Sequence, residues 1–177
     1  TAERCFFRDG SGNSEENTWI RFTDGMLTNC VIDEGVAGLR VEGGTTRAYH
    51  CTIVSRDDEG TTGVLAVWSP TDSNHEVVNS IVDGFSIAFA GDVTAGTDNV
   101  VGSDPAFTTD STGPGTGDFH LQASSPAIAI GDPALGVSTD IELQARPVPA
   151  TTDPDAGAYE EQVTEPTSVN EWMLLND

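Results

Sequence analysis

The sequence predicts an all-β fold: a short right-handed parallel β-helix of about five coils, with an irregular C-terminal cap. Two observations carry this prediction. Short segments alternate between apolar and polar residues, as strands with one buried face do. These segments recur at intervals of 19 to 29 residues through the first hundred residues, which is typical of a solenoid. A β-helix constrains only its strands, so turns of unequal length are tolerated.

The repeat is defined by a frame in which a polar residue precedes a small or polar residue and two mostly β-prone residues. Its copies are Arg4–Phe7, Asn29–Ile32, His50–Ile53, Asn79–Val82 and Asp98–Val101. A second predicted strand follows in most units, at Trp19–Phe22, Gly38–Val41, Val64–Trp68 and Ser86–Phe89. Turn signals such as Asp24-Gly25 and Glu42-Gly43-Gly44 bound these strands.

Stacked coils place equivalent residues about 4.8 Å apart. The frame therefore predicts a core ladder of Cys5, Cys30, Cys51, Ser80 and Asn99. We interpret the cysteines as buried and reduced. A Cys30–Cys51 disulfide is the alternative, although parallel strands in register do not aim the two Cβ atoms at each other. No closely spaced Cys or His pair accompanies them, so zinc is not predicted.

The charge of the chain excludes several functions. Seven basic residues, all arginine, face 29 acidic residues, for a net charge of -22. Such a chain does not suit nucleic acid or an anionic membrane surface. Residues 1–56 hold six of the arginines and eight acidic residues, whereas residues 57–177 hold one arginine and 21 acidic residues. This polarity favours head-to-tail contact between copies.

The composition changes after residue 102, which divides the chain into coils (1–102), a cap (103–160), and a linker with an apolar tail (161–177). The cap carries motifs in a fixed order: Asp104–Phe107, Asp118–Leu121, Ser125–Asp132, Thr139–Ile141, Ala145–Pro147 and Asp155–Glu160. This order resembles the C-terminal end of bacterial secreted right-handed parallel β-helix proteins, the choice-of-anchor or pectate-lyase-like repeat proteins. The resemblance implies the same fold and an extracellular or cell-surface location. Departures from the family pattern are Ala129 in place of Asp, Glu142-Leu143 in place of Asp-Gly, and Asp155-Ala156 in place of Asp-Ile.

The cap is expected to cover the open end of the solenoid, because an open end exposes unpaired backbone and core. Arg146 is the one cation among the acids of residues 57–177, so we expect it to form a cap ion pair. Its expected partners are Asp140, Asp155 or Glu160. The apolar tail packs back on the solenoid, begins a further domain, or inserts into a neighbouring subunit as an assembly tail. Its apolar residues are Trp172, Met173, Leu174 and Leu175.

Candidate catalytic residues follow from the lyases and hydrolases that use this fold, and they are Arg40, His50, Asp33 and Asp83. Asp33 and Asp83 each follow a ladder position by three residues and are expected to stack. A turn-forming role for these aspartates is the favoured interpretation, because Asp near Gly commonly starts a turn. Candidate Ca²⁺ ligands are Asp57, Asp58 and Asp132, with a solvated acidic surface as the favoured alternative.

These observations favour an extracellular structural or surface protein that acts by self-assembly or adhesion, without a required cofactor. Its expected partners are a second copy of the chain, a cell surface or a polysaccharide. The alternatives are a carbohydrate-active enzyme, most simply a polysaccharide lyase, and a carbohydrate-binding module. No apolar run approaches the roughly 20 residues of a membrane span.

Overall fold

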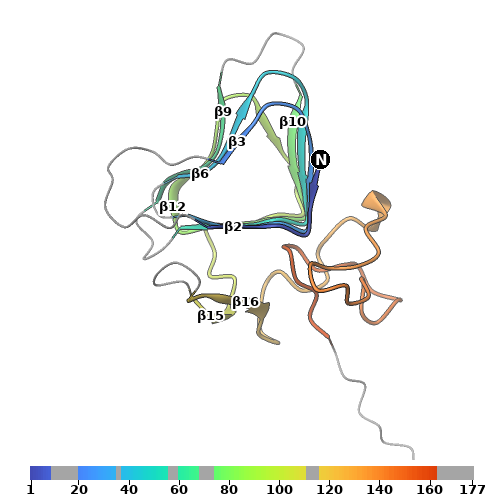
Figure 1. Cartoon of the computed structure of the whole chain (residues 1–177). Coiled ribbons are helices and arrows are strands. Elements are labelled where there is room, and N and C mark those ends of the chain that lie inside the picture. The colour runs from blue at the N-terminus through green and yellow to red at the C-terminus, as the bar shows by residue number, and fades with distance from the viewer. Residues whose placement is uncertain (9–19, 35–36, 56–59, 68–73, 111–115, 163–177) are drawn as a thin grey trace, which may run out of the picture.

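The computed structural model of the chain is a parallel β-solenoid with a triangular cross-section (Figure 1). It describes residues 1–8, 20–34, 37–55, 60–67, 74–110 and 116–162. Each coil runs through three faces, and each face is one parallel sheet. The predicted all-β solenoid class is therefore confirmed.

The three sheets are built from strands that recur in every coil. Sheet A holds β1 (Ala2–Glu3), β4 (Gly25–Thr28), β7 (Thr46–Tyr49), β10 (His75–Val78) and β13 (Val93–Ala95). Sheet B holds β2 (Phe6–Arg8), β5 (Val31–Glu34), β8 (Thr52–Ser55), β11 (Ile81–Asp83) and β14 (Val100–Val101). Sheet C holds β3 (Ile20–Phe22), β6 (Ala37–Glu42), β9 (Gly60–Val67) and β12 (Phe85–Ala90).

The number of coils is smaller than predicted. Three coils run through all three sheets at full length: β4–β6, β7–β9 and β10–β12. The flanking turns are short, since β1 and β14 contain two residues each and β14 is followed by no sheet C strand in the described part of the chain. The solenoid therefore has about three full coils rather than about five.

The sequence predicted two strands per coil, and the structure has three. The missed strands are those of sheet A, most of which begin within a few residues of a predicted turn. In β7 the side chains alternate, with Thr46 and Ala48 buried and Arg47 exposed. This short strand has an exposed polar face, which is why its pattern is weak in the sequence.

The repeating frame marks the corner between sheets A and B. Its first residue adopts the left-handed conformation in four successive coils, with φ of 52° at Arg4, 51° at Asn29, 50° at His50 and 53° at Asn79. Asparagine tolerates this conformation better than most residues. The left-handed residue turns the chain by a sharp angle, and the small residue after it begins the inner wall of sheet B.

The interior of the solenoid is a narrow apolar core. Its buried members are Leu27, Cys30, Ile32, Leu39, Val41, Ala48, Cys51, Ile53, Val64, Val77 and Val82. The outer face of sheet B carries a second apolar row, which includes Val31 and Ile81. This row needs a cover, and the C-terminal segment supplies it.

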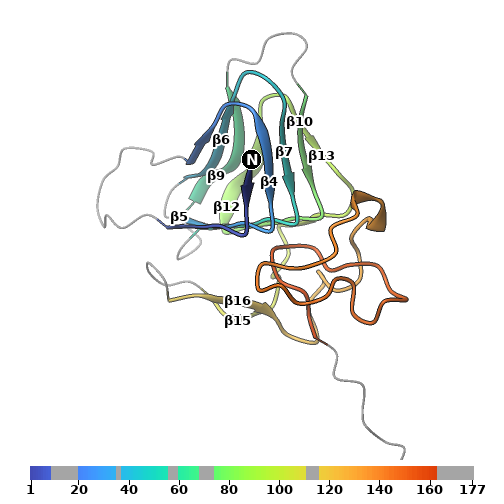
Figure 2. The same ribbon diagram turned by 45° about the vertical axis from the view of Figure 1, so that its right-hand side comes forward.

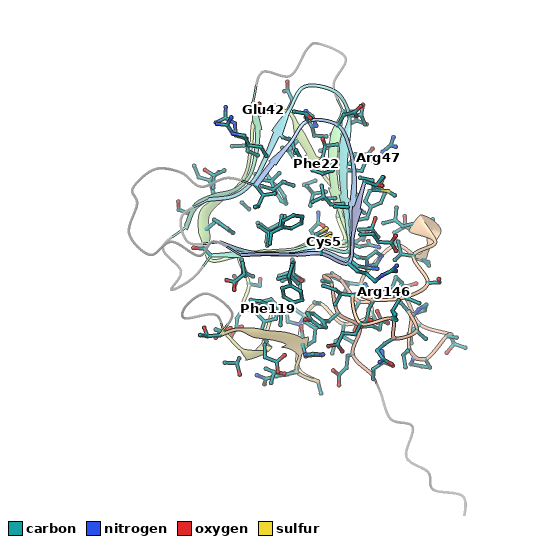
Figure 3. The ribbon with its side chains drawn as sticks, viewed as in Figure 1. Cys5, Phe22, Glu42, Arg47, Phe119 and Arg146 are labelled. Atoms are coloured by element: carbon teal, nitrogen blue, oxygen red, sulfur yellow. The ribbon has the colours of Figure 1, made fainter. Side chains whose placement is uncertain are left out.

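Residues 104–110 and 116–162, here called the lateral segment, lie along the side of the solenoid rather than across its end (Figures 1 and 2). The segment contains the antiparallel pair β15 (Phe107–Thr109) and β16 (Asp118–Leu121), followed by the short 3-10 helix η2 (Pro133–Leu135). Phe119 lies between sheet B and this pair of strands (Figure 3). The prediction of an end cap is therefore wrong, because the apolar outer face of sheet B binds the segment.

None of the described helices is long and apolar enough to cross a membrane.

Candidate functional site

The structure does not bring the four candidate catalytic residues together. Arg40 lies on sheet C, where its Nε is 2.6 Å from a carboxylate oxygen of Glu42. His50 lies at the corner between sheets A and B. Asp33 and Asp83 both lie on sheet B, and each is paired in register with Val54 of the coil between them. The expected direct stacking of the two aspartates is therefore wrong, because a full coil separates them.

Of the three calcium candidates, the structure describes Asp132. The Asp132 Oδ1 accepts a hydrogen bond from the backbone N–H of Ala134 at 2.8 Å and so caps η2. Asp57 and Asp58 lie outside the described residues, as do the tail residues from Trp172 to Leu175. Among the described residues, no three His, Cys, Asp or Glu side chains are grouped so that they could hold one metal ion.

A groove of about 890 Å³ lies between the solenoid, near its β12–β14 end, and Phe107 and Phe119 of the lateral segment. Its apolar wall also includes Val82 and Phe85, which belong to the solenoid core, and Val101 of β14. Val101 is 39% exposed. The rim carries acidic and hydroxyl groups, among them Asp83, Asp104, Asp110, Ser86 and Ser103. Of the predicted catalytic residues, only Asp83 lines this groove.

A second cluster is buried where the lateral segment meets the corner of the solenoid, and Arg146 lies at its centre (Figure 3). Its Nη1 donates to the backbone oxygen of Asp155 at 2.7 Å, and its Nη2 donates to that of Gly157 at 3.1 Å. The Nε is 3.5 Å from Glu160 Oε2, and both side chains are fully buried. The Nη1 also contacts His50 Nδ1.

The carboxylates around Arg146 hold the backbone of the lateral segment. Glu160 accepts hydrogen bonds from the N–H groups of Val148 and Asp155 at 2.9 and 3.0 Å. Asp155 accepts from the N–H groups of Ala129 and Glu161 at 2.8 and 2.6 Å.

Asp140 completes this set of carboxylates. It accepts hydrogen bonds from Glu142 and Gln144 at 2.9 and 2.8 Å, and from Glu160 N–H at 3.2 Å. These loops lack regular secondary structure, so the carboxylates replace the backbone partners that a sheet would provide.

Burial controls the ionisation of this cluster. Loss of hydration raises the pKa of Glu160 to about 7 and raises the pKa of Asp155. Burial, followed by the charge of Arg146, lowers the pKa of His50 to about 3, so this imidazole is neutral at physiological pH. Burial also lowers the pKa of Arg146.

Asn79 and His50 join the lateral segment to the corner of the solenoid. Asn79 exchanges two hydrogen bonds with the backbone of Asp132, at 2.8 and 3.0 Å. Its amide nitrogen lies 2.9 Å from His50 Nε2, which must then act as acceptor. On the other side of the ring, His50 Nδ1 lies 3.1 Å from Asp155 O and in contact with Arg146 Nη1. His50 and Asn79 thus bind the lateral segment to two successive coils.

The cluster around Arg146 is therefore a structural junction. Its charged atoms bond to backbone groups and to one another, and this leaves little capacity for a substrate. A small cavity of about 150 Å³ lies beside His50 and Arg146 and is lined partly by Pro133, Pro147 and Pro154. The sequence did not predict that Asn79 belongs to this junction. The one relevant feature was its position as the first residue of a copy of the repeating frame.

The predicted ladder residues occupy equivalent corner positions in successive coils, because the residues that follow them are paired in register. Cys30 and Cys51 are fully buried, Cys5 is half-buried, and all three are free thiols. Ser80 continues the row: its hydroxyl accepts a hydrogen bond from Cys51 N–H at 3.1 Å.

No protein-family model matches the sequence. Comparison with curated proteins and with solved structures likewise gives no match.

Proposed function

We propose that this chain is an extracellular structural β-helix module that assembles with further copies through the β12–β14 end of its solenoid. The observation that carries this proposal is the uncovered end. Strands β12, β13 and β14 are paired on one side only within the described part of the chain, since the lateral segment lies along sheet B. Unpaired strand edges beside an apolar groove readily accept further strands.

Charge favours a second copy in head-to-tail orientation as the partner. The rim of the groove carries Asp83, Asp104 and Asp110. The first coil exposes Arg4 and Arg21, and residues 1–56 hold six of the seven arginines of the chain. Arginines at one end and carboxylates at the other favour this orientation, and repeated head-to-tail contact produces a filament because it does not close.

The extracellular setting is supported by the family resemblance of residues 104–160. The motifs from Asp104–Phe107 to Asp155–Glu160 follow the order found in secreted pectate-lyase-like repeat proteins. An acidic surface without lysine also suits a protein that must stay soluble at high salt.

Light scattering over a concentration series tests the proposal. The wild-type chain is expected to grow in mass with concentration, and Val101→Asp is expected to remain monomeric because it adds a like charge to the acidic rim. Met26→Asp is the matched control, since Met26 is 38% exposed on the side of sheet A, compared with 39% for Val101.

Two outcomes would overturn the proposal. One is a monomer at every concentration in the wild type. The other is a mass increase that Val101→Asp leaves unchanged while deletion of residues 169–177 removes it, because the tail would then be the contact.

A second candidate function is binding of a glycan in the same groove. Carboxylates and hydroxyls such as Asp110, Ser86 and Ser103 suit the hydroxyl groups of sugars, while the acidic rim disfavours uronates. Binding on a glycan array that Val101→Trp abolishes and Met26→Trp preserves would support it. No binding to neutral or amino sugars would reject it.

A further inference from the structure

The three cysteines form a straight row along the inner wall of the corner between sheets A and B. Each thiol lies against the carbonyl oxygen of the residue two positions earlier, at 3.4 Å for Cys5, 3.3 Å for Cys30 and 3.5 Å for Cys51. Cys30 and Cys51 also approach a carbonyl oxygen of the preceding coil, at 3.7 and 3.8 Å. The three side chains therefore share one orientation and point in parallel.

This repetition sets the separation of the sulfur atoms. Parallel side chains in neighbouring coils are spaced like the strands themselves, by about 4.8 Å. A cation bound linearly between two thiolates needs sulfur atoms about 4.6 Å apart, twice a metal–thiolate bond of about 2.3 Å. A tetrahedral ion such as Zn²⁺ needs ligands that converge on one point, and thiols in a row do not provide them.

We propose that the cysteine row is a binding site for a soft monovalent cation, Cu(I) or Ag(I), held linearly between Cys30 and one neighbouring cysteine. Soft thiolate ligands select such ions over harder divalent ones. Binding breaks two S–H bonds, forms two metal–sulfur bonds and releases two protons to solvent. The oxidation state of the metal does not change.

The hydrogen bond between the two buried thiols lowers the pKa of Cys30 and raises the pKa of Cys51, so Cys30 is the first of the two to become a thiolate. The thiol of Cys51 donates a hydrogen bond to Cys30, which lowers the pKa of Cys30 to about 7. The guanidinium of Arg146 acts on Cys51 and offsets part of the negative charge of a bis-thiolate complex. In this chain the half-buried Cys5 offers an entry point for the ion at one end of the row.

Titration of the reduced chain with silver nitrate in chloride-free buffer at pH 6 tests the proposal. Native mass spectrometry is expected to show one silver ion per chain. Ultraviolet absorbance is expected to rise through metal–thiolate charge transfer, and a pH-stat is expected to record two protons released per ion. The melting temperature is expected to increase, because only the folded chain aligns the thiols.

Three sets of variants identify the ligands. Cys30→Ser and the double variant Cys5→Ser with Cys51→Ser are expected to weaken silver binding by at least about 100-fold. The single variants Cys5→Ser and Cys51→Ser each leave one adjacent pair and are expected to bind one ion within about tenfold of the wild-type affinity.

Unchanged affinity in Cys30→Ser, or a silver ion that bridges two chains, would overturn the proposal. If Cys30→Ser does not fold, as judged by circular dichroism, the double variant tests the site instead. It retains Cys30 but neither neighbouring cysteine, so it should bind silver at least about 100-fold more weakly than the wild type. Wild-type affinity in the double variant would then reject the site.

Discussion

At the residue scale, the corner between sheets A and B combines two requirements. Its first residue must adopt the left-handed conformation, and its side chain must bind the lateral segment. Asn29 and Asn79 do both: the amide of Asn29 donates to Thr139 O at 2.7 Å, and Asn79 bonds to the backbone of Asp132. His50 does the same while buried and neutral, which makes it sensitive to pH.

The substitution His50→Asn is expected to weaken the acid dependence of stability. In the unfolded chain the pKa of His50 is about 6.5, and in the folded chain burial lowers this pKa to about 3. Between these values the unfolded state binds the proton more strongly, so the free energy of unfolding decreases as pH falls from 6.5 towards 3, by a few kcal/mol.

Urea denaturation of both proteins across this pH range measures the effect. The raised pKa of Glu160 acts in the opposite direction between about pH 4.5 and 7, but it is common to both proteins. The difference between their curves therefore reports His50. A difference that does not change with pH would contradict this assignment.

Replacement of the buried Arg146 by Met is expected to reduce the free energy of unfolding by about 3–5 kcal/mol, because buried carboxylates lose their counter-ion. Arg47→Met is the matched control. The Arg47 Nε is 3.1 Å from Glu76 Oε2, but the arginine side chain is 48% exposed, so a loss within about 1 kcal/mol is expected. An equal decrease in the free energy of unfolding in the two variants would show that Arg146 does not hold the junction together.

At the element scale, the lateral segment is bound to sheet B through close backbone contact. Gly157 has a φ of +95°, and its N–H donates to Asn79 O at 2.8 Å. The next N–H, of Ala158, donates to Thr52 Oγ1 at 3.0 Å. A side chain at Gly157 would prevent this approach, since an added Cβ would lie 2.7 Å from the Ile81 Cδ1 atom.

Gly157→Ala is therefore expected to loosen the lateral segment, at a cost about 2–3 kcal/mol greater than Gly136→Ala. Gly136 also has a positive φ, of +65°, but no atom lies within 4 Å of an added Cβ. Hydrogen exchange should show faster exchange at Ala156 and Ala158 than in the control, with little change at Val31 in the solenoid. Equal exchange in both variants would indicate that backbone strain alone matters.

At the scale of the whole molecule, electrostatic self-repulsion opposes folding. The net charge is -22 and only seven residues are basic. Salt screens this repulsion, with a Debye length of about 30 Å at 0.01 M and about 3 Å at 1 M.

The melting temperature is expected to increase by several degrees as sodium chloride rises from about 0.01 M to 1 M. Differential scanning calorimetry at pH 7 measures this increase. The same series near the isoelectric point of 4.1 is the control, where the increase should largely disappear. An equal increase at both pH values would indicate a salt effect unrelated to net charge.

Much of the solenoid could be predicted from the sequence, because its coils repeat locally. The spacing of Cys5, Cys30 and Cys51 gave the stacking register, and the strands of sheets B and C followed from apolar alternation. The strands of sheet A were missed because their exposed faces are polar and the strands are short. The predicted stacking of Asp33 on Asp83 was wrong. The two aspartates share a position in the frame, but the coil that carries Val54 lies between them.

The sequence by itself determined the fold class, the repeating frame and the uneven distribution of charge, because each depends on local patterns along the chain. Only the tertiary structure decided that the lateral segment covers sheet B, and that no described strand pairs with the outer edges of β12, β13 and β14. It also decided which groups Arg146 and His50 contact. The contacts of His50 with Arg146 and Asp155 join residues about 100 positions apart. Their geometry depends on the packing of two apolar surfaces that no local pattern specifies.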